Sequence, residues 1–563
     1  MTRAGVVAVV ALALTAGLAL RVARLDVRPM HHDEANQAVK FGALLERGEY
    51  RYDAHDHHGP TLYYLSLPAA WLRGQGTLAS LDERTLRGVT AVFGAATILL
   101  LPLMATGIGR TAVAAAAILM AVSPAMVFYS RMFIQESLFA CFTLAFVIAA
   151  GRMAMGGGLV WSTAAGVAAG LAVATKETAI IVLPAALVAG VISWWSLGPG
   201  RPRNPLADGR WRVGALVFLG TAAAIAALFF SSFLAAPAGV LEPVRAAGTY
   251  LRRGLDPVSH AHPWHYYLGL LAYSSSGGLR WSEGLVLVLA TVGVAGGRRS
   301  FHFLPSQRMK SAPTRCTFLP GAFWARHLTI YVAITTAILS AIAYKTPWNL
   351  LPFYVVLITL AGVGFSTLVH AASSRVVRGA LIAGLVIGSG HLGWQAWRAS
   401  VTYASDPRNP YVYVQTVPDA VRMATRIREL AAVHPDGSGM QVSVIAPAYE
   451  QWPLPWYLRS MPHVGYWTAP GDALALQAPV VVASMDHAPV LDGTLEDRYV
   501  SEFFGLRPGV LMALYVERGL WDRFLAVAAG DTSAAACLGA PRGAAGRCGH
   551  APTVALWRTT SAP

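Results

Sequence analysis

Long apolar runs alternate with short polar segments over about the first 400 residues of the chain, and the alternation then stops. A run of about 17 to 22 apolar residues has the length that an α-helix needs to cross a membrane. We therefore predict eleven membrane-spanning helices. They lie at 5–24, 87–106, 111–128, 132–150, 159–174, 178–196, 213–235, 282–297, 326–343, 349–369 and 379–397.

The last part of the chain follows another pattern. Strand-like runs at 441–447 and 479–484 alternate with helix-like stretches such as 419–433 and 500–524. This alternation is typical of a small α/β domain. The expected architecture is an all-α polytopic membrane domain of about 11 helices at 1–397, followed by an extracytoplasmic α/β domain at 398–563.

Composition supports a membrane protein. Hydrophobic residues make up 55% of the 563 residues and charged residues only 13%, too few charges to coat a soluble protein of this size. The formal net charge of +15 would also suit a nucleic-acid partner. The basic residues, however, lie in short segments between apolar runs, which favours cytoplasmic loops over nucleic-acid binding.

Charge placement also predicts an orientation. With the N-terminus in the cytoplasm, the segments on that side hold fifteen Lys and Arg against one acid, Asp208. We expect a multi-pass plasma-membrane protein whose loops 25–86 and 236–281 and C-terminal domain face outward. The first run also fits a cleaved signal peptide, which leaves this topology unchanged. In the outer domain, Cys537 and Cys548 suit either a disulfide or two free thiols.

The first outer loop carries adjacent carboxylates, Asp33 and Glu34, beside His31 and His32. Neighbouring like charge and partial burial raise the pKa of a carboxyl group, so this pair could supply a general base. A solvated loop in which Asp33 caps a helix is the alternative.

Histidines are concentrated on the same predicted face. Eight of the sixteen lie in three outward runs, namely His31, His32, His55, His57, His58, His260, His262 and His265. Imidazoles with a nearby aspartate suit a divalent cation such as zinc or manganese, a phosphate or sugar hydroxyl, or simple polar loop structure. The metal hypothesis uses His55, His57 and His265 as ligands.

Charged residues also flank or interrupt the predicted spans at their outer ends. Those that we single out are Arg131, Glu136, Lys176, Glu177 and Lys345. Each alone suits an interfacial anchor. Glu136 lies about one turn inside its span, so we expect it to face a polar cavity or a partner such as Arg131 or Lys176. Together, cations beside a carboxylate loop suit a lipid phosphate whose tail stays in the bilayer.

These motifs, in this order, resemble the GT-C superfamily of membrane glycosyltransferases. The resemblance is to the branch of protein O-mannosyltransferases and aminoarabinose transferases, and most closely to the prokaryotic flippase-activity-associated family. It covers about the first 400 residues. The residues that carry it are His32–Ala35, His58–Tyr64, Ser130–Arg131 with Glu136, Thr175–Glu177 and Lys345–Trp348.

The resemblance implies that Asp33 is the catalytic carboxylate, with Glu34 as its neighbour, in transfer from a polyprenyl-phosphate sugar donor to a protein, lipid or glycan acceptor. Single displacement would invert the anomeric carbon. The substrate-binding candidates are His32, His57, His58, Arg131, Glu136, Lys176, Glu177, Lys345 and Trp348.

Other interpretations remain. A transporter or flippase component for lipid-linked glycans would share the spans and the cations, but no inverted repeat is visible and the polar groups gather at one face. A non-catalytic scaffold leaves Asp33 and Glu34 unexplained. In the outer domain, the aromatic segment 452–459 suits either an acceptor platform or a packing surface.

Overall fold

The computed structural model describes residues 1–48, 50–53, 58–197, 210–254, 260–299, 321–471, 475–495 and 497–529. The chain forms two compact units. The first comprises Met1–Pro418 with Trp452–Arg459, and the second comprises Asp419–Gln451 with Ser460–Pro563. Residues 398–418 and 452–459, predicted as part of the outer domain, therefore lie with the helical unit.

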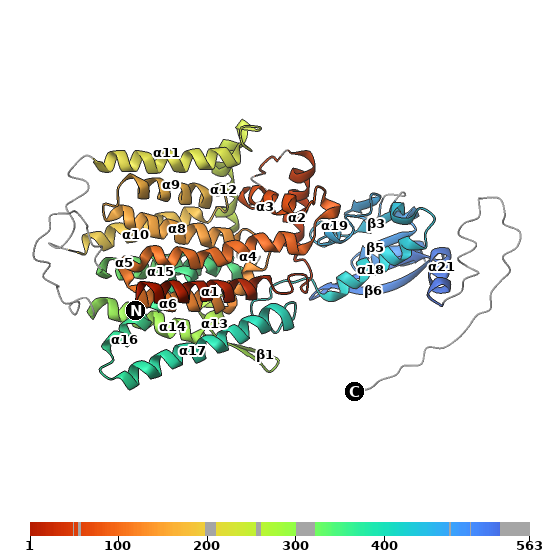
Figure 1. The fold of residues 1–563 in the computed structure, drawn as a ribbon. Helices are drawn as coiled ribbons and strands as arrows, with labels where there is room; N and C mark the ends of the chain where they lie inside the picture. Colours follow the sequence, from red (N-terminus) through yellow and green to blue (C-terminus); the bar gives the residue numbers. More distant parts are fainter. Residues whose placement is uncertain are drawn as a thin grey trace, which may run out of the picture. The chain divides into compact units, whose positions relative to one another are not determined.

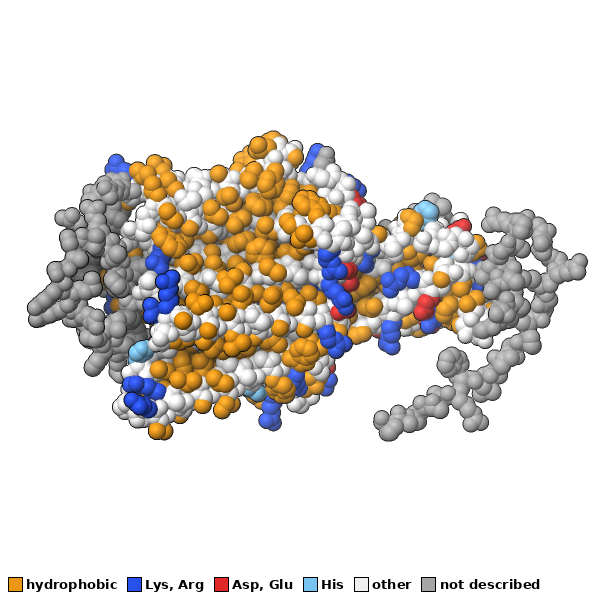
Figure 2. Space-filling model, viewed as in Figure 1, with side chains coloured by type: hydrophobic (Ala, Val, Ile, Leu, Met, Phe, Trp, Pro, Cys, Tyr) orange, Lys and Arg blue, Asp and Glu red, His pale blue; other side chains and the backbone are white. Residues whose placement is uncertain are grey.

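Long helices stacked side by side make up the first unit (Figure 1). They are α1 (Arg3–Val22), α4 (Glu83–Leu100), α6 (Arg110–Val122), α7 (Pro124–Ser130), α8 (Glu136–Ala154), α9 (Leu159–Val173), α10 (Ala179–Trp195), α11 (Arg210–Phe230), α14 (Gly284–Arg299), α15 (Gly321–Ala341), α16 (Leu351–Ala371) and α17 (Arg375–Trp397). Hydrophobic side chains cover the visible side of this unit, whereas Lys and Arg gather near its ends (Figure 2).

Among the described residues, seven helices are long and apolar enough to cross a membrane, or eight if the bent pair of α6 and α7 forms one span. Three shorter apolar helices lie at Leu159–Val173, Ala179–Trp195 and Gly284–Gly296. Each predicted apolar run coincides with one of these helices or with the bent pair. The chain is a multi-pass integral membrane protein with a helical membrane domain.

The bend of 55° between α6 and α7 has a local cause. Ser123 caps α7 and Pro124 occupies its first turn, where proline needs no hydrogen-bond donor. The buried Glu283 carboxylate accepts hydrogen bonds from the Ser123 hydroxyl at 2.6 Å and the Ala125 amide at 2.8 Å. The second bond satisfies a backbone amide that a continuous helix would have paired internally.

Small residues bring the helices close together. At Gly364 of α16, an added Cβ would lie 1.8 Å from the carbonyl oxygen of Leu289 in α14. This position therefore requires glycine, as membrane helix interfaces commonly do.

Shorter elements connect these helices. They are α2 (His32–Arg47), α3 (Thr61–Leu72), η1 (Leu78–Ser80), α12 (Glu242–Gly254), α13 (Tyr266–Ala272), β1 (Ser274–Ser276), β2 (Leu279–Trp281), η6 (Pro347–Leu350) and α19 (Leu454–Tyr457). In Figure 1, α2 and α3 lie at the end of the bundle opposite the N-terminus. This end holds the candidate site.

The second unit is an α/β unit with a mixed five-stranded sheet of order β4-β3-β5-β7-β6, in which β3 pairs parallel with β4 and β5 and the remaining pairs are antiparallel. Its strands are β3 (Val442–Ile445), β4 (Val464–Trp467), β5 (Val480–Ser484), β6 (Tyr499–Arg507) and β7 (Val510–Glu517). Its helices are α18 (Pro418–Ala432), α20 (Ala488–Leu495) and α21 (Arg518–Ala528). The predicted strands at 441–447 and 479–484 and the helix at 419–433 are confirmed.

The prediction of a helix over 500–524 is wrong for most of its length. β6 and β7 form an antiparallel hairpin there, and only the last part is helical, in α21. Gly509 in the turn has a φ of +81°, which glycine adopts without strain. The dipeptide Pro508-Gly509 was the turn signal that separates these strands.

Candidate active site

The N-terminus of α2 holds Asp33 at the molecular surface. His31 caps the helix, because its Nδ1 accepts the Asp33 amide at 3.0 Å while its own amide donates to Glu34 at 3.0 Å. The Asp33 side chain is 43% exposed, and its carboxylate lies 3.7 Å from the His31 ring. The cap is thus His31, and Asp33 projects from the first turn with its carboxylate accessible.

Glu34 has the opposite environment. Its side chain is fully buried and accepts from Arg87 at 2.7 and 2.8 Å, from Arg28 at 3.5 Å and from the Phe133 amide at 2.9 Å. Burial alone would raise the pKa of Glu34, but the charges of Arg87 and Arg28 outweigh it and lower the pKa to about 2. Glu34 is therefore an ionised anchor of the loop.

Arg131 binds the end of α1. Its guanidinium donates to five backbone carbonyls, those of Leu20, Arg21, Ala23, Arg24 and Ser400. The last carbonyls of a helix have no partner within the helix, so Arg131 supplies one. Burial lowers the pKa of Arg131 to about 9, which leaves it charged at neutral pH. This arrangement gives Arg131 a structural role.

Histidines and aromatic residues from distant segments meet beside Asp33. Tyr413 joins them, because its carbonyl lies 3.1 Å from His31 Nε2 and its hydroxyl lies 2.5 Å from His260 Nδ1 and 3.4 Å from His262 Nε2. The Trp348 ring packs against the rings of His31 and Tyr413, with centroids 5.6 and 5.9 Å apart. Residues from four separate segments thus surround one edge of α2.

The electrostatics of this cluster keep the rings of His260 and His262 neutral. Burial lowers the pKa of His260 and His262, although the Asp33 carboxylate opposes this effect at His260. Burial raises the pKa of Tyr413 to about 12, so its hydroxyl remains protonated and can donate to His260. The Asp33 carboxylate lies beside these rings and interacts electrostatically with His260.

Lys345 anchors the neighbouring loop. Its ammonium donates to the carbonyl of His262 at 2.9 Å and to that of Ile342, and its amide donates to the carbonyl of His260 at 3.0 Å. Burial lowers its pKa. Lys345 thus ties its own segment to the segment that carries the two histidines.

Glu136 and Lys176 form a buried ion pair at 2.5 Å. The prediction that Glu136 needs a charged partner or a polar cavity is confirmed. The Lys176 ammonium also donates to Asn349 at 2.8 Å. Because Asn349 follows Trp348 in η6, this short element contacts both the ion pair and the cluster around Asp33.

Glu177, next in the chain, binds Tyr52 and His58 of the first outer loop. It lies 2.7 Å from His58 Nδ1 and accepts from the Tyr52 hydroxyl at 3.2 Å. Gly59 makes this contact possible, since a Cβ at that position would lie 2.2 Å from the carbonyl oxygen of Ala174. The two motifs therefore dock through backbone as well as side chains.

The metal hypothesis is not tested by these contacts. His55 and His57 lie outside the described residues, as do Cys537 and Cys548. His265 precedes α13 and contacts the ring of Trp264. Among the described residues, no group of three or more His, Cys, Asp or Glu side chains could hold a metal ion.

The aromatic segment 452–459 packs against the loops of its own unit. The Trp456 indole donates to Glu83 at 2.9 Å, and the Met30 amide donates to the Tyr457 hydroxyl at 2.7 Å. His32 faces the Trp452 ring, with centroids 6.0 Å apart. These contacts favour the packing surface over the acceptor platform.

Several residues of this region were not anticipated: Arg28, Arg87, Asn349 and Tyr413. Arg87 offered a signal, because a charge at the start of an apolar run needs a partner. Tyr413 offered none, since its contacts depend on segments that are remote in the sequence.

Comparison with known proteins adds a family match over part of the chain. Residues 11–202 match the family model described as dolichyl-phosphate-mannose-protein mannosyltransferase. No curated protein sequence matches the chain significantly.

Solved structures share the fold at low sequence identity. ArnT from Cupriavidus metallidurans bound to undecaprenyl phosphate has a TM-score of 0.54 and 15% identity, covering 91% of this chain and 98% of that one. The Archaeoglobus fulgidus oligosaccharyltransferase tethered with an acceptor peptide has a TM-score of 0.56 and 13% identity, and the match covers 90% of this chain and 74% of that one. The S. cerevisiae protein O-mannosyltransferase Pmt1-Pmt2 complex bound to the sugar donor has a TM-score of 0.54 and 12% identity, and the match covers 76% of this chain and 92% of that one.

The shared fold extends over most of this chain. The family match runs from within α1 to the end of α10 and includes Asp33, Arg131, Glu136 and Lys176. The family match supports a glycosyltransferase that uses a lipid-phosphate sugar donor, and the solved structures show the fold that this chain shares with them.

Proposed function

We propose that the protein transfers a sugar from a polyprenyl-phosphate donor to an acceptor hydroxyl on a protein, lipid or glycan, with inversion and with Asp33 as the general base. The observation that carries this proposal is the contrast between the two adjacent carboxylates. Glu34 is fully buried between arginines, whereas the Asp33 side chain is 43% exposed within a ring of histidines and aromatics.

The proposed reaction is a single displacement. The acceptor oxygen attacks the anomeric carbon as its proton passes to the Asp33 carboxylate, and the bond from that carbon to the phosphate oxygen breaks. The polyprenyl phosphate leaves with one more negative charge. Positioning of the acceptor and stabilisation of this charge are the contributions that the protein must supply.

Two lysines are the best candidates for the phosphate. An ammonium group has three protons to donate. Within the described residues, Lys176 donates to Glu136 and Asn349, and Lys345 donates to two carbonyls, so each can make a further hydrogen bond. Arg131 contributes by holding the end of α1. The roles of His32, His58, Glu177 and Trp348 are to shape the loops around the donor.

The proposed site faces the outside of the plasma membrane. This assignment uses eleven crossings, a cytoplasmic N-terminus and the basic loops between the spans. It also agrees with membership of the flippase-activity-associated family, which we propose as the subfamily.

An accessibility experiment tests the orientation. In a chain whose native cysteines are replaced, Ser438→Cys in the second unit should react with a membrane-impermeant maleimide on intact cells. Ser373→Cys, in a segment predicted to be cytoplasmic, is the matched control and should react only after lysis. Both positions are exposed in the structure. Protection of position 438 with labelling of position 373 would overturn the orientation.

A reconstituted assay tests the catalytic role. With a radiolabelled polyprenyl-phosphate sugar and membrane extract as the acceptor source, Asp33→Asn should slow transfer by about 10²- to 10⁴-fold, because it removes the base. Asp26→Asn is the matched control, since Asp26 lies in the same loop and pairs with Arg84 at the surface. Equal transfer by wild type and Asp33→Asn would exclude the proposed base. Movement of the lipid without release of polyprenyl phosphate would instead indicate a flippase.

A further inference from the structure

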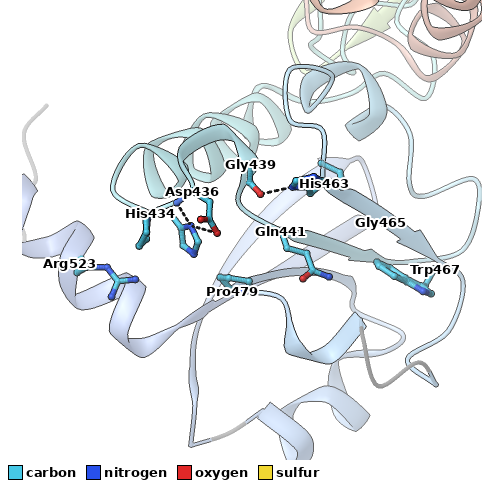
Figure 3. A pocket seen from close by; sticks show the side chains of 11 residues that line it. His434, Asp436, Gly439, Gln441, His463, Gly465, Trp467, Pro479 and Arg523 are labelled. Carbon is cyan, nitrogen blue, oxygen red and sulfur yellow. Dashed lines mark hydrogen bonds and ion pairs between the residues drawn. The ribbon is translucent and has the colours of Figure 1, made fainter. Parts of the chain in front are cut away.

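The second unit contains an open pocket of about 800 Å³ (Figure 3). It lies where the parallel strands begin, because Gln441, His463 and Pro479 line it and directly precede β3, β4 and β5. Ligands of α/β sheets usually bind at the opposite, carboxyl ends of the strands. This pocket lies instead at the amino ends of β3, β4 and β5.

Two histidines in the pocket present opposite hydrogen-bonding groups. His463 Nδ1 lies 2.7 Å from the Gly439 carbonyl and must donate to it, which leaves Nε2 as an acceptor in the neutral ring. His434 Nδ1 accepts the Asp436 amide at 3.2 Å, which leaves Nε2 as a donor. The pair can thus bind both the proton and the oxygen of hydroxyl groups.

The remaining polar side chains balance in charge. Arg523 supplies a cation whose Nε is buried without a hydrogen-bond partner among the described residues. Asp436 supplies an anion with a side chain that is 73% exposed. Burial lowers the pKa of His434, which keeps this ring neutral at neutral pH. The Asp436 carboxylate in the lining makes the pocket better suited to a neutral ligand than to a simple anion.

An aromatic ring forms one side of the pocket. Figure 3 shows Trp467 on the side opposite His434 and Arg523. Its ring folds back over Gly465, where an added Cβ would lie 1.9 Å from the indole. Glycine at this position of β4 therefore permits the ring to take up its place in the pocket.

We propose that this pocket binds a neutral saccharide, with the apolar face of a sugar ring on Trp467 and its hydroxyls bonded to His434, His463 and Arg523. Mixed donors and acceptors around one aromatic surface suit a ligand that presents hydroxyls along its edges and C–H groups on its face. The site is additional to the transfer site at Asp33 and does not depend on the proposed base.

Saturation-transfer NMR on the full chain in lipid nanodiscs tests the proposal. The probes are maltose, mannobiose and lactose, with inorganic phosphate as the anionic probe. At least one disaccharide should receive saturation from the wild type, and Trp467→Ala should reduce this signal at least fivefold. Trp521→Ala, a tryptophan of the same unit outside the pocket, is the matched control and should retain it.

Further variants separate a lost ligand contact from a lost fold. Gln441 lines the pocket and is exposed, so its amide can also bond a saccharide hydroxyl. Gln441→Leu should therefore keep the thermal unfolding temperature and still lower the signal. Asp33→Asn should leave the signal unchanged, which distinguishes this site from the transfer site. No saturation of any disaccharide, equal signals in wild type, Trp467→Ala and Gln441→Leu, or binding of phosphate alone would overturn the proposal.

Discussion

The exposed rim of the candidate active site and the buried framework next to it use adjacent residues in opposite ways. We define the rim as Asp33, His260, His262 and Tyr413, and the framework as Arg28, Glu34, Arg87 and Arg131. The rim keeps neutral rings around an accessible carboxylate, whereas the framework holds its carboxylate between arginines. The neighbours of a carboxylate therefore decide whether its role is chemical or structural. Asp33 and Glu34 differ in this way although they are adjacent in the chain.

The largest effect on stability should follow from breaking the framework. Glu34→Gln keeps the shape of the side chain but leaves the buried arginines without their counter-charge, so we expect a loss of about 3–5 kcal/mol in the free energy of unfolding. Thermal unfolding followed by tryptophan fluorescence in detergent measures it. Asp33→Asn is the matched control and should change stability by less than about 0.5 kcal/mol. Equal losses of stability in Glu34→Gln and Asp33→Asn would contradict the distinction between rim and framework.

Lowering the pH should weaken the interaction of Glu34 with the framework arginines. The pKa of Glu34 is lowered to about 2 in the folded protein from an ordinary value of 4.5. Its contribution is therefore fully present above about pH 4.5 and is lost as the pH falls toward 2, amounting to about 3 kcal/mol. Unfolding measured between about pH 6 and 3 should show a steeper loss for wild type than for Glu34→Gln. Parallel curves would mean that Glu34 is not held in its ionised form.

The sequence predicted the positions of the apolar helices well, because hydrophobic length is a local property. It also anticipated that Glu136 needs a partner, since a charge beside an apolar run is costly wherever the chain folds. It could not separate a phosphate ligand from a helix anchor at Arg131. That distinction depends on the end of α1, more than a hundred residues away. Tyr413 was missed for the same reason.

A smaller effect should come from the contact between the His58–Tyr64 segment and the Thr175–Glu177 turn. Gly59→Ala places a methyl group 2.2 Å from a backbone oxygen, which the chain can relieve only by moving one loop. We expect a loss of about 1–3 kcal/mol in stability. Gly76→Ala is the control, because an added Cβ there meets no atom within 4 Å. Unchanged unfolding temperature in Gly59→Ala would show that this docking is loose.

The smallest effect concerns the rim itself. Tyr413→Phe removes the hydroxyl that bonds to His260 and His262 while keeping the ring against Trp348. Loss of a neutral hydrogen bond costs about 0.5–1.5 kcal/mol, so transfer should slow by roughly threefold to tenfold. The free energy of unfolding should fall by no more than this amount, because the rim is partly exposed.

Tyr273→Phe is the matched control for this effect, since Tyr273 is 58% exposed and outside the rim. If the rim orients Asp33 through its rings, Tyr413→Phe should lower the rate of transfer in single-turnover experiments, where product release does not contribute. A change confined to the unfolding temperature would instead assign Tyr413 to the framework. Asp33 would then remain in the rim without Tyr413, and the base would act without support from the histidines that Tyr413 contacts.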